Sequence, residues 1–156
     1  ACLTRHTAII EAGGFNTHLI IAEDYLLWME VSVIAPIIRV PEVLAQYHHH
    51  DGVQATHNRA LAVLDTFRAK QLFLERHAEV ATQLGPDKIE SLTWGKLMEQ
   101  GDALHWKGDL NNARPVFRKA LLAGQGSTAA KLRMLPSLLP LWLHRAIITA
   151  KERLNP

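Results

Sequence analysis

Apolar and aromatic side chains recur at helical spacing along most of the chain. Glycine and proline residues separate these periodic segments, because both residue types end helices. The pattern predicts helices over residues 7–12, 22–35, 56–84, 86–107 and 110–123, and a last helix that begins near residue 137.

A different pattern lies between two of these helices. Residues 37–47 are rich in apolar side chains and predict a strand that is interrupted at Pro41, and residues 1–6 are expected to end another strand. The sequence therefore predicts an α/β first part with few strands, residues 1–57. An all-α extension, residues 58–156, is expected to follow it.

Small and aromatic residues mark one helical hairpin in the second half. Their offsets resemble those of a tetratricopeptide repeat, of which about three copies make a free-standing array. Because one copy is visible, we interpret the segment as a packing hairpin rather than a peptide-binding array. The residues are Gly101, Leu104, Gly108, Ala113, Phe117 and Ala120.

Composition excludes several classes of protein. Of the 156 residues, 48% are hydrophobic and 21% are charged, which excludes a disordered chain or a coiled coil. The single cysteine, Cys2, excludes a disulfide framework and a cysteine-based zinc site. No apolar run reaches the roughly 18 residues of a membrane-spanning helix. Without an initiator Met or a signal peptide, the chain is expected to be part of a longer, cytoplasmic protein.

Charge is divided unevenly along the chain. Residues 1–52 carry two basic and six acidic side chains, a net charge of −4, and residues 53–156 carry fifteen basic and nine acidic ones, a net charge of +6. Either the two parts differ in function, or the long helices simply carry more Lys and Arg. Nucleic acid is not an expected partner, because no dense basic patch with interleaved aromatic residues occurs.

A pair of carboxylates is the first candidate for chemistry. Glu23 and Asp24 lie in the first turn of a predicted helix, where the helix dipole favours ionised carboxylates. A carboxylate held there is a plausible general base, although acidic residues at helix starts are more often caps. Gly13-Gly14, upstream, permits a sharp turn and a close backbone approach.

Three segments in this order resemble the C-terminal half of the catalytic domain of family 2 glycosyltransferases, which have the GT-A fold. That family has a Gly-Gly-Phe-Asp-like turn, then a Glu-Asp-Tyr-Asp-Leu-Trp-like helix start, then a strand that ends in Tyr-Arg-x-His. The resemblance covers about residues 1–57. The matching residues are Gly13-Gly14-Phe15-Asn16, Glu23-Asp24-Tyr25 with Leu27-Trp28, and Tyr47 with His50.

The resemblance implies a catalytic role for Asp24, which would take the proton from the acceptor hydroxyl as it attacks the anomeric carbon of a nucleotide sugar. Glu23 would hydrogen-bond the acceptor or orient Asp24. Trp28 would line the acceptor site by stacking on a sugar ring, although a core aromatic residue is an equal interpretation. The resemblance places three more residues at the acceptor site: Gly14, Phe15 and Tyr25.

The resemblance assigns His50 to the diphosphate or to a divalent cation, Mg²⁺ or Mn²⁺, and His48 stands where the family has Arg. A neutral imidazole would hold a diphosphate more weakly than a guanidinium. The histidines also allow a transition-metal site made by His48, His50, Asp51 and His57, or a solvent-facing strand end. Asn16, Leu26 and Glu30 depart from the family pattern, and Leu26 and Glu30 bear on acceptor contacts.

Two features of the family's donor half are missing. No Asp-x-Asp motif and no glycine-rich phosphate loop occur in the sequence. The chain by itself is therefore expected not to transfer sugar from a nucleotide-sugar donor to a glycan or lipid-linked acceptor. The alternative is a non-catalytic helical module that binds other proteins.

The last segment is apolar and basic. Residues 131–156 contain five Lys and Arg residues and Glu152 as the single acidic residue. A basic amphipathic helix with Trp142 is expected either to lie on an anionic membrane surface or to cover the helical hairpin or a second copy of the chain.

Overall fold

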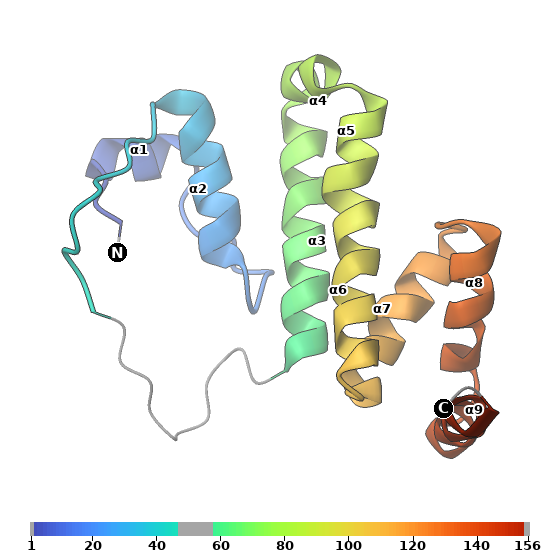
Figure 1. Cartoon of the computed structure of the whole chain (residues 1–156). Helices are drawn as coiled ribbons and strands as arrows, with labels where there is room; N and C mark the ends of the chain where they lie inside the picture. The colour runs from blue at the N-terminus through green and yellow to red at the C-terminus, as the bar shows by residue number, and fades with distance from the viewer. Residues whose placement is uncertain (1, 47–57, 155–156) are drawn as a thin grey trace.

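The computed structural model describes residues 2–46 and 58–154, and side chains up to residue 150. Every regular element in these ranges is helical. The elements, shown in Figure 1, are α1 (His6–Glu11), α2 (Glu23–Ile34), α3 (Arg59–Arg76), α4 (Ala78–Leu84), α5 (Pro86–Glu90), the π-helical turn η2 (Ser91–Gly95), α6 (Lys96–Trp106), α7 (Leu110–Leu122), α8 (Thr128–Met134), the 3-10 turn η3 (Leu135–Leu138) and α9 (Leu141–Leu154).

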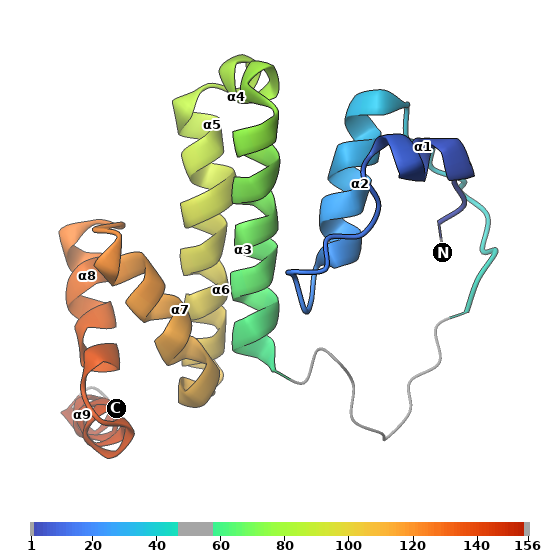
Figure 2. The same ribbon diagram turned by 180° about the vertical axis from the view of Figure 1, so that it is seen from behind.

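The helices stand roughly in a row in chain order. Both views show α3 between α2 on one side and α6 on the other, with α7, α8 and α9 beyond α6 (Figures 1 and 2). The short helix α4 lies at the end of α3, so that α3 and the continuous helical run α5–η2–α6 form an antiparallel pair.

Helices α2 and α3 run in the same direction. The backbone just before α2 bonds to Asp65 in the first half of α3, and Glu30 near the end of α2 bonds to residues at the end of α3. Parallel neighbours require the chain to return along the full length of α2, about 18 Å for 12 residues. The chain that joins the two helices must therefore span that distance.

Two apolar clusters share α3. Its Ala69 and Phe73 pack with Leu19 and Leu26 from the first part of the chain. A larger cluster lies on the other side, and it joins α3 to α6, α7 and α8. Its buried members are Phe67, Leu97, Leu104, Ala113, Val116, Phe117, Ala120 and Met134.

The predicted hairpin is present as α6 and α7. Gly101 allows the two helices to approach closely, because a Cβ at this position would lie 2.9 Å from both the Phe117 ring and the Val116 side chain. Gly108, at the turn, has a φ of +74°, which favours glycine. Asp109 caps α7, since its side chain accepts a hydrogen bond from the backbone N–H of Asn112.

The predicted α/β fold is wrong for the part of the chain that the structure describes, where no strand forms. Residues 2–5 are irregular, and so are residues 36–46, within which the predicted strand begins. A strand needs a neighbour for its backbone N–H and C=O groups, and none lies beside residues 37–46 within the described ranges. Pro36 and Pro41 also lack an N–H. Ile37, Ile38, Val40, Val43 and Leu44 are all more than half exposed, so neither face of this segment is covered.

Helix boundaries differ from the prediction in two places. The helix predicted over residues 56–84 ends at Arg76 and begins again at Ala78, and residues 56–57 lie outside the described ranges. The helix expected from residue 137 begins at Leu141, and the prediction missed α8. Ser127 starts α8 by accepting a hydrogen bond from the N–H of Ala130, an ordinary N-cap.

Candidate functional site

The backbone that leads into α2 is fixed by one buried carboxylate. Oδ2 of Asp65, on α3, accepts hydrogen bonds from the backbone N–H groups of Ile20 and Ile21 at 3.1 and 3.0 Å. Ala22 follows in the left-handed conformation with a φ of +70°, which is strained for a residue with a side chain. It is also buried. Tertiary contacts therefore hold the start of α2 in a conformation that the local sequence does not favour.

The first turn of α2 carries Glu23 and Asp24, as predicted. Asp24 is exposed, and its Oδ1 accepts one hydrogen bond, at 2.7 Å, from the N–H of Tyr25. Glu23 is half-buried. Neither carboxylate forms an ion pair with a cation in the described ranges. The structure thus presents an acidic, solvent-accessible helix start on a fixed backbone.

The two aromatic residues of α2 are neighbours on the helix surface. Trp28 is half-buried and follows Asp24 by four residues, so both side chains lie on one face of the helix. Tyr25 precedes Trp28 by three residues and lies one turn before Met29. Tyr25 and Met29 help line an apolar groove towards α3 and the following helices, together with Lys70, Phe73, Leu74, Leu84, Ile89, Leu92 and Thr93.

The other two predicted acceptor residues lie in the loop after α1. Gly13 and Gly14 have φ values of +83° and +71°, so both adopt the left-handed conformation that the Gly-Gly pair predicted. Phe15 is 55% exposed. Helix α1 packs against α2. It lies beside the upper part of α2, whereas α2 begins with Glu23 at its lower end (Figures 1 and 2).

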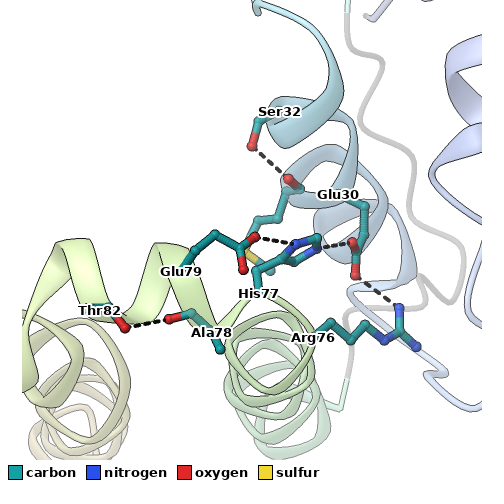
Figure 3. A network of polar contacts seen from close by, with 8 residues as sticks. Glu30, Ser32, Arg76, His77, Ala78, Glu79 and Thr82 are labelled. Carbon is teal, nitrogen blue, oxygen red and sulfur yellow. Dashed lines mark hydrogen bonds and ion pairs between the residues drawn. The ribbon is translucent and has the colours of Figure 1, made fainter.

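A second buried carboxylate holds the far end of α2. Glu30 is 7% exposed, and its two oxygens contact the Arg76 guanidinium at 2.9 Å and Nε2 of His77 at 2.6 Å. Figure 3 shows the His77 ring between Glu30 and Glu79, whose carboxylate lies 3.6 Å from Nδ1. Glu30 therefore joins α2 to the junction of α3 and α4.

Sequence reasoning missed the roles of Asp65, Arg76 and His77. Asp65 and its backbone partners are 44 and 45 residues apart in sequence, and Glu30 is 46 and 47 residues from its partners. One signal was present, since a carboxylate such as Asp65 within an apolar helical segment needs a buried partner.

The proposed diphosphate and metal ligands His48 and His50 lie outside the described residues. So do Tyr47, Asp51 and His57. Within the described ranges, no group of three His, Cys, Asp or Glu side chains lies close enough together to hold a metal ion.

Comparison with known proteins gives no match: no family model, no curated protein and no solved structure matches the chain. Each helix of the described chain is too short or too polar to span a lipid bilayer.

Proposed function

We propose that residues 2–46 form the acceptor side of a sugar-transfer site, with Asp24 as the general base. The observation that carries this proposal is the contrast among the carboxylates around α2. Asp65 and Glu30 are buried, and their bonds hold the helix in place. Asp24 is exposed and makes one local hydrogen bond, so its carboxylate is accessible to a substrate proton.

The chemistry of the proposed step follows from that carboxylate. Asp24 accepts the proton of an acceptor hydroxyl while the hydroxyl oxygen forms a bond to the anomeric carbon of a nucleotide sugar. The bond between that carbon and the diphosphate oxygen breaks, and its electron pair leaves with the nucleoside diphosphate. Glu23, beside it, orients Asp24 or hydrogen-bonds the acceptor.

Position on the helix supports a role for Trp28. It shares a face with Asp24, and an indole ring offers an apolar surface on which a sugar ring stacks. The acceptor would then be a glycan or a lipid-linked sugar that contacts Trp28 and meets Asp24 with one hydroxyl. Tyr25 and the Gly14-Phe15 loop would contribute contacts at the edge of this site.

Donor binding requires residues beyond this set. The sequence has no Asp-x-Asp motif and no glycine-rich phosphate loop. We therefore expect the 156-residue chain to transfer no sugar by itself. Detectable turnover by the purified chain would contradict this expectation.

A second candidate function is binding to another protein. The apolar side chains of residues 37–44 favour it, because five of them are more than half exposed and have no cover in the described chain. The two functions differ in what they require of Asp24: protein binding through residues 37–44 leaves its carboxylate dispensable.

The test compares glycans in the cells that produce the protein. The gene is deleted or given the Asp24→Asn change, and glycans and glycolipids are profiled by mass spectrometry. A lost general base slows transfer by about 10²–10⁴-fold, so Asp24→Asn should abolish the same product as the deletion.

Asp87→Asn is the matched control, since Asp87 is an exposed carboxylate in the first turn of another helix, α5. It should leave the product unchanged. An unchanged glycan profile after deletion, or a normal product with Asp24→Asn at normal protein level, would refute the proposal and favour the binding module.

A further inference from the structure

One long segment of the chain carries positive charge without acidic residues. Between Leu110 and Lys151 the sequence contains seven Lys and Arg residues and no Asp or Glu. Some of these cations have structural bonds, such as Arg133, which contacts Asp102 at 2.7 Å. Lys131 and the exposed Arg145 form no ion pair within the described chain. Lys131 and Arg145 therefore give this end of the molecule a positive charge that no ion pair in the described chain neutralises.

Apolar side chains are exposed along the same elements. Leu132, Leu135 and Leu138 follow one another at intervals of three residues and are 63%, 46% and 49% exposed, and Trp142, four residues on, is 70% exposed. Such spacing places the three leucines along one side of α8 and η3. We call these four residues the leucine–tryptophan stripe.

The opposite side of the same elements is packed against the protein. Met134, Ser137 and His144 are each no more than 1% exposed, and Arg114 and Arg118 of α7 both donate a hydrogen bond to the backbone carbonyl of Ser137 in η3. Because α8, η3 and α9 are anchored through this side, the leucine–tryptophan stripe is a fixed outer surface. It is not a core face exposed by a loose helix.

We infer that the leucine–tryptophan stripe and its basic neighbours, Lys131 and Arg145, dock on an anionic lipid surface. Leucine and tryptophan side chains enter the boundary between headgroups and acyl chains, and each nearby Lys or Arg adds electrostatic attraction to acidic lipids. The charge favours an anionic lipid over an apolar protein partner, since Lys131 and Arg145 flank the stripe and form no ion pair within the described chain. Nucleic acid fits less well, because Trp142 is the one aromatic side chain in the stripe on which a base could stack.

The experiment measures binding of the full chain to vesicles by flotation. One set of vesicles is phosphatidylcholine, and the other contains about 30% phosphatidylglycerol. We expect binding to the anionic vesicles to be at least about tenfold stronger and to weaken at high salt.

Two variants test the two parts of the surface. Trp142→Ser should weaken anionic-vesicle binding about tenfold. Reversing the charges of Lys131 and Arg145 to Glu should weaken it by about 25-fold or more. The matched controls are Trp106→Ser, since Trp106 is 72% exposed outside the stripe, and Arg68→Glu on the exposed side of α3. Both controls should bind as the wild type does, and circular dichroism verifies that every variant is folded.

Three results would overturn the inference. One is equal binding to neutral and anionic vesicles, or binding to neither. Another is a Trp106→Ser variant that loses as much binding as Trp142→Ser. The third is a dimer in analytical ultracentrifugation that Trp142→Ser dissociates while vesicles do not bind, which would assign the stripe to a second copy of the chain.

Discussion

The α2–α3 interface and the α6–α7 hairpin are held by different kinds of contact. In the hairpin, Gly101 lets the Phe117 ring lie against the α6 backbone, and Phe117 is 1% exposed. At the α2–α3 interface, the small apolar cluster is flanked by two buried carboxylates, Asp65 before α2 and Glu30 near its end. Shape and apolar burial hold one pair of helices, and directional polar bonds hold much of the other.

We interpret the α6–α7 hairpin as a scaffold and the α2–α3 interface as the region that positions the candidate site. Apolar burial is non-directional, whereas a carboxylate that accepts two backbone N–H groups fixes the direction of that backbone. The start of α2 is fixed in this way although Ala22 is strained there. The exposed Asp24, two residues further on, is thus presented in a set direction.

The largest expected effect is in the hairpin. Phe117→Ala should lower the free energy of unfolding by about 3–5 kcal/mol, because it leaves a cavity against Gly101. Phe15→Ala is the control, since Phe15 is 55% exposed. Urea unfolding followed by circular dichroism measures both. Equal losses would show that the hairpin is not the more tightly packed region.

A smaller effect is expected at the charged interface. Glu30→Gln should lower the free energy of unfolding by about 1–2 kcal/mol, because it weakens the contacts with Arg76 and His77. The loss stays moderate because Arg76 is about half exposed and is rehydrated. Glu79→Gln is the control on the same histidine, since Glu79 is 67% exposed and 3.6 Å away. Should Glu79→Gln cost as much as Glu30→Gln, burial would not be the source of the effect.

The smallest expected change in the free energy of unfolding depends on pH. It involves His144, which lies where α9 meets α6 and α7. Burial lowers the pKa of His144 below its usual 6.5, and His105 of α6 and Arg114 of α7 lower it further. The folded state therefore holds His144 neutral, while the unfolded state takes up a proton below about pH 6.5. The contribution of neutral His144 to the free energy of unfolding is therefore complete above about pH 6.5. It is lost as the pH falls towards the pKa of His144 in the folded state.

The free energy of unfolding, measured at pH 7 and at pH 5, tests the direction of this pH dependence. The wild type should lose more stability on acidification than His144→Leu, which has no group to titrate at this position. A wild type and a variant with the same pH dependence would exclude His144 as the source.

Sequence patterns predicted the hairpin because its signals are local. The offsets from Gly101 to Ala120 lie within one pair of helices. The strand prediction failed because apolar side chains favour an extended backbone but do not supply a neighbouring strand. In the described chain, residues 37–46 have no neighbouring strand. Helix α8 was missed because glycines just before it indicated a joint, although the Ser127 cap signal was present.

The candidate site was predictable only in part. The helix start at Glu23 and the left-handed Gly13-Gly14 turn were expected and are present. The bonds of Asp65 and Glu30 join residues 44–47 positions apart, a separation at which local periodicity contains no information. The catalytic and acceptor roles of Asp24, Glu23 and Trp28 stay predictions.

The most direct test of the account compares Asp24→Asn with Asp65→Ala in the same cells and in purified protein. Asp65→Ala leaves two backbone N–H groups unsatisfied and should lower stability by about 2–4 kcal/mol, or roughly 4–16 °C in Tm. Asp24→Asn should keep Tm within about 2 °C, since Asp24 is exposed, yet abolish the glycan product. If Asp24→Asn keeps the product, or lowers Tm as much as Asp65→Ala does, Asp24 is not the base of a positioned site.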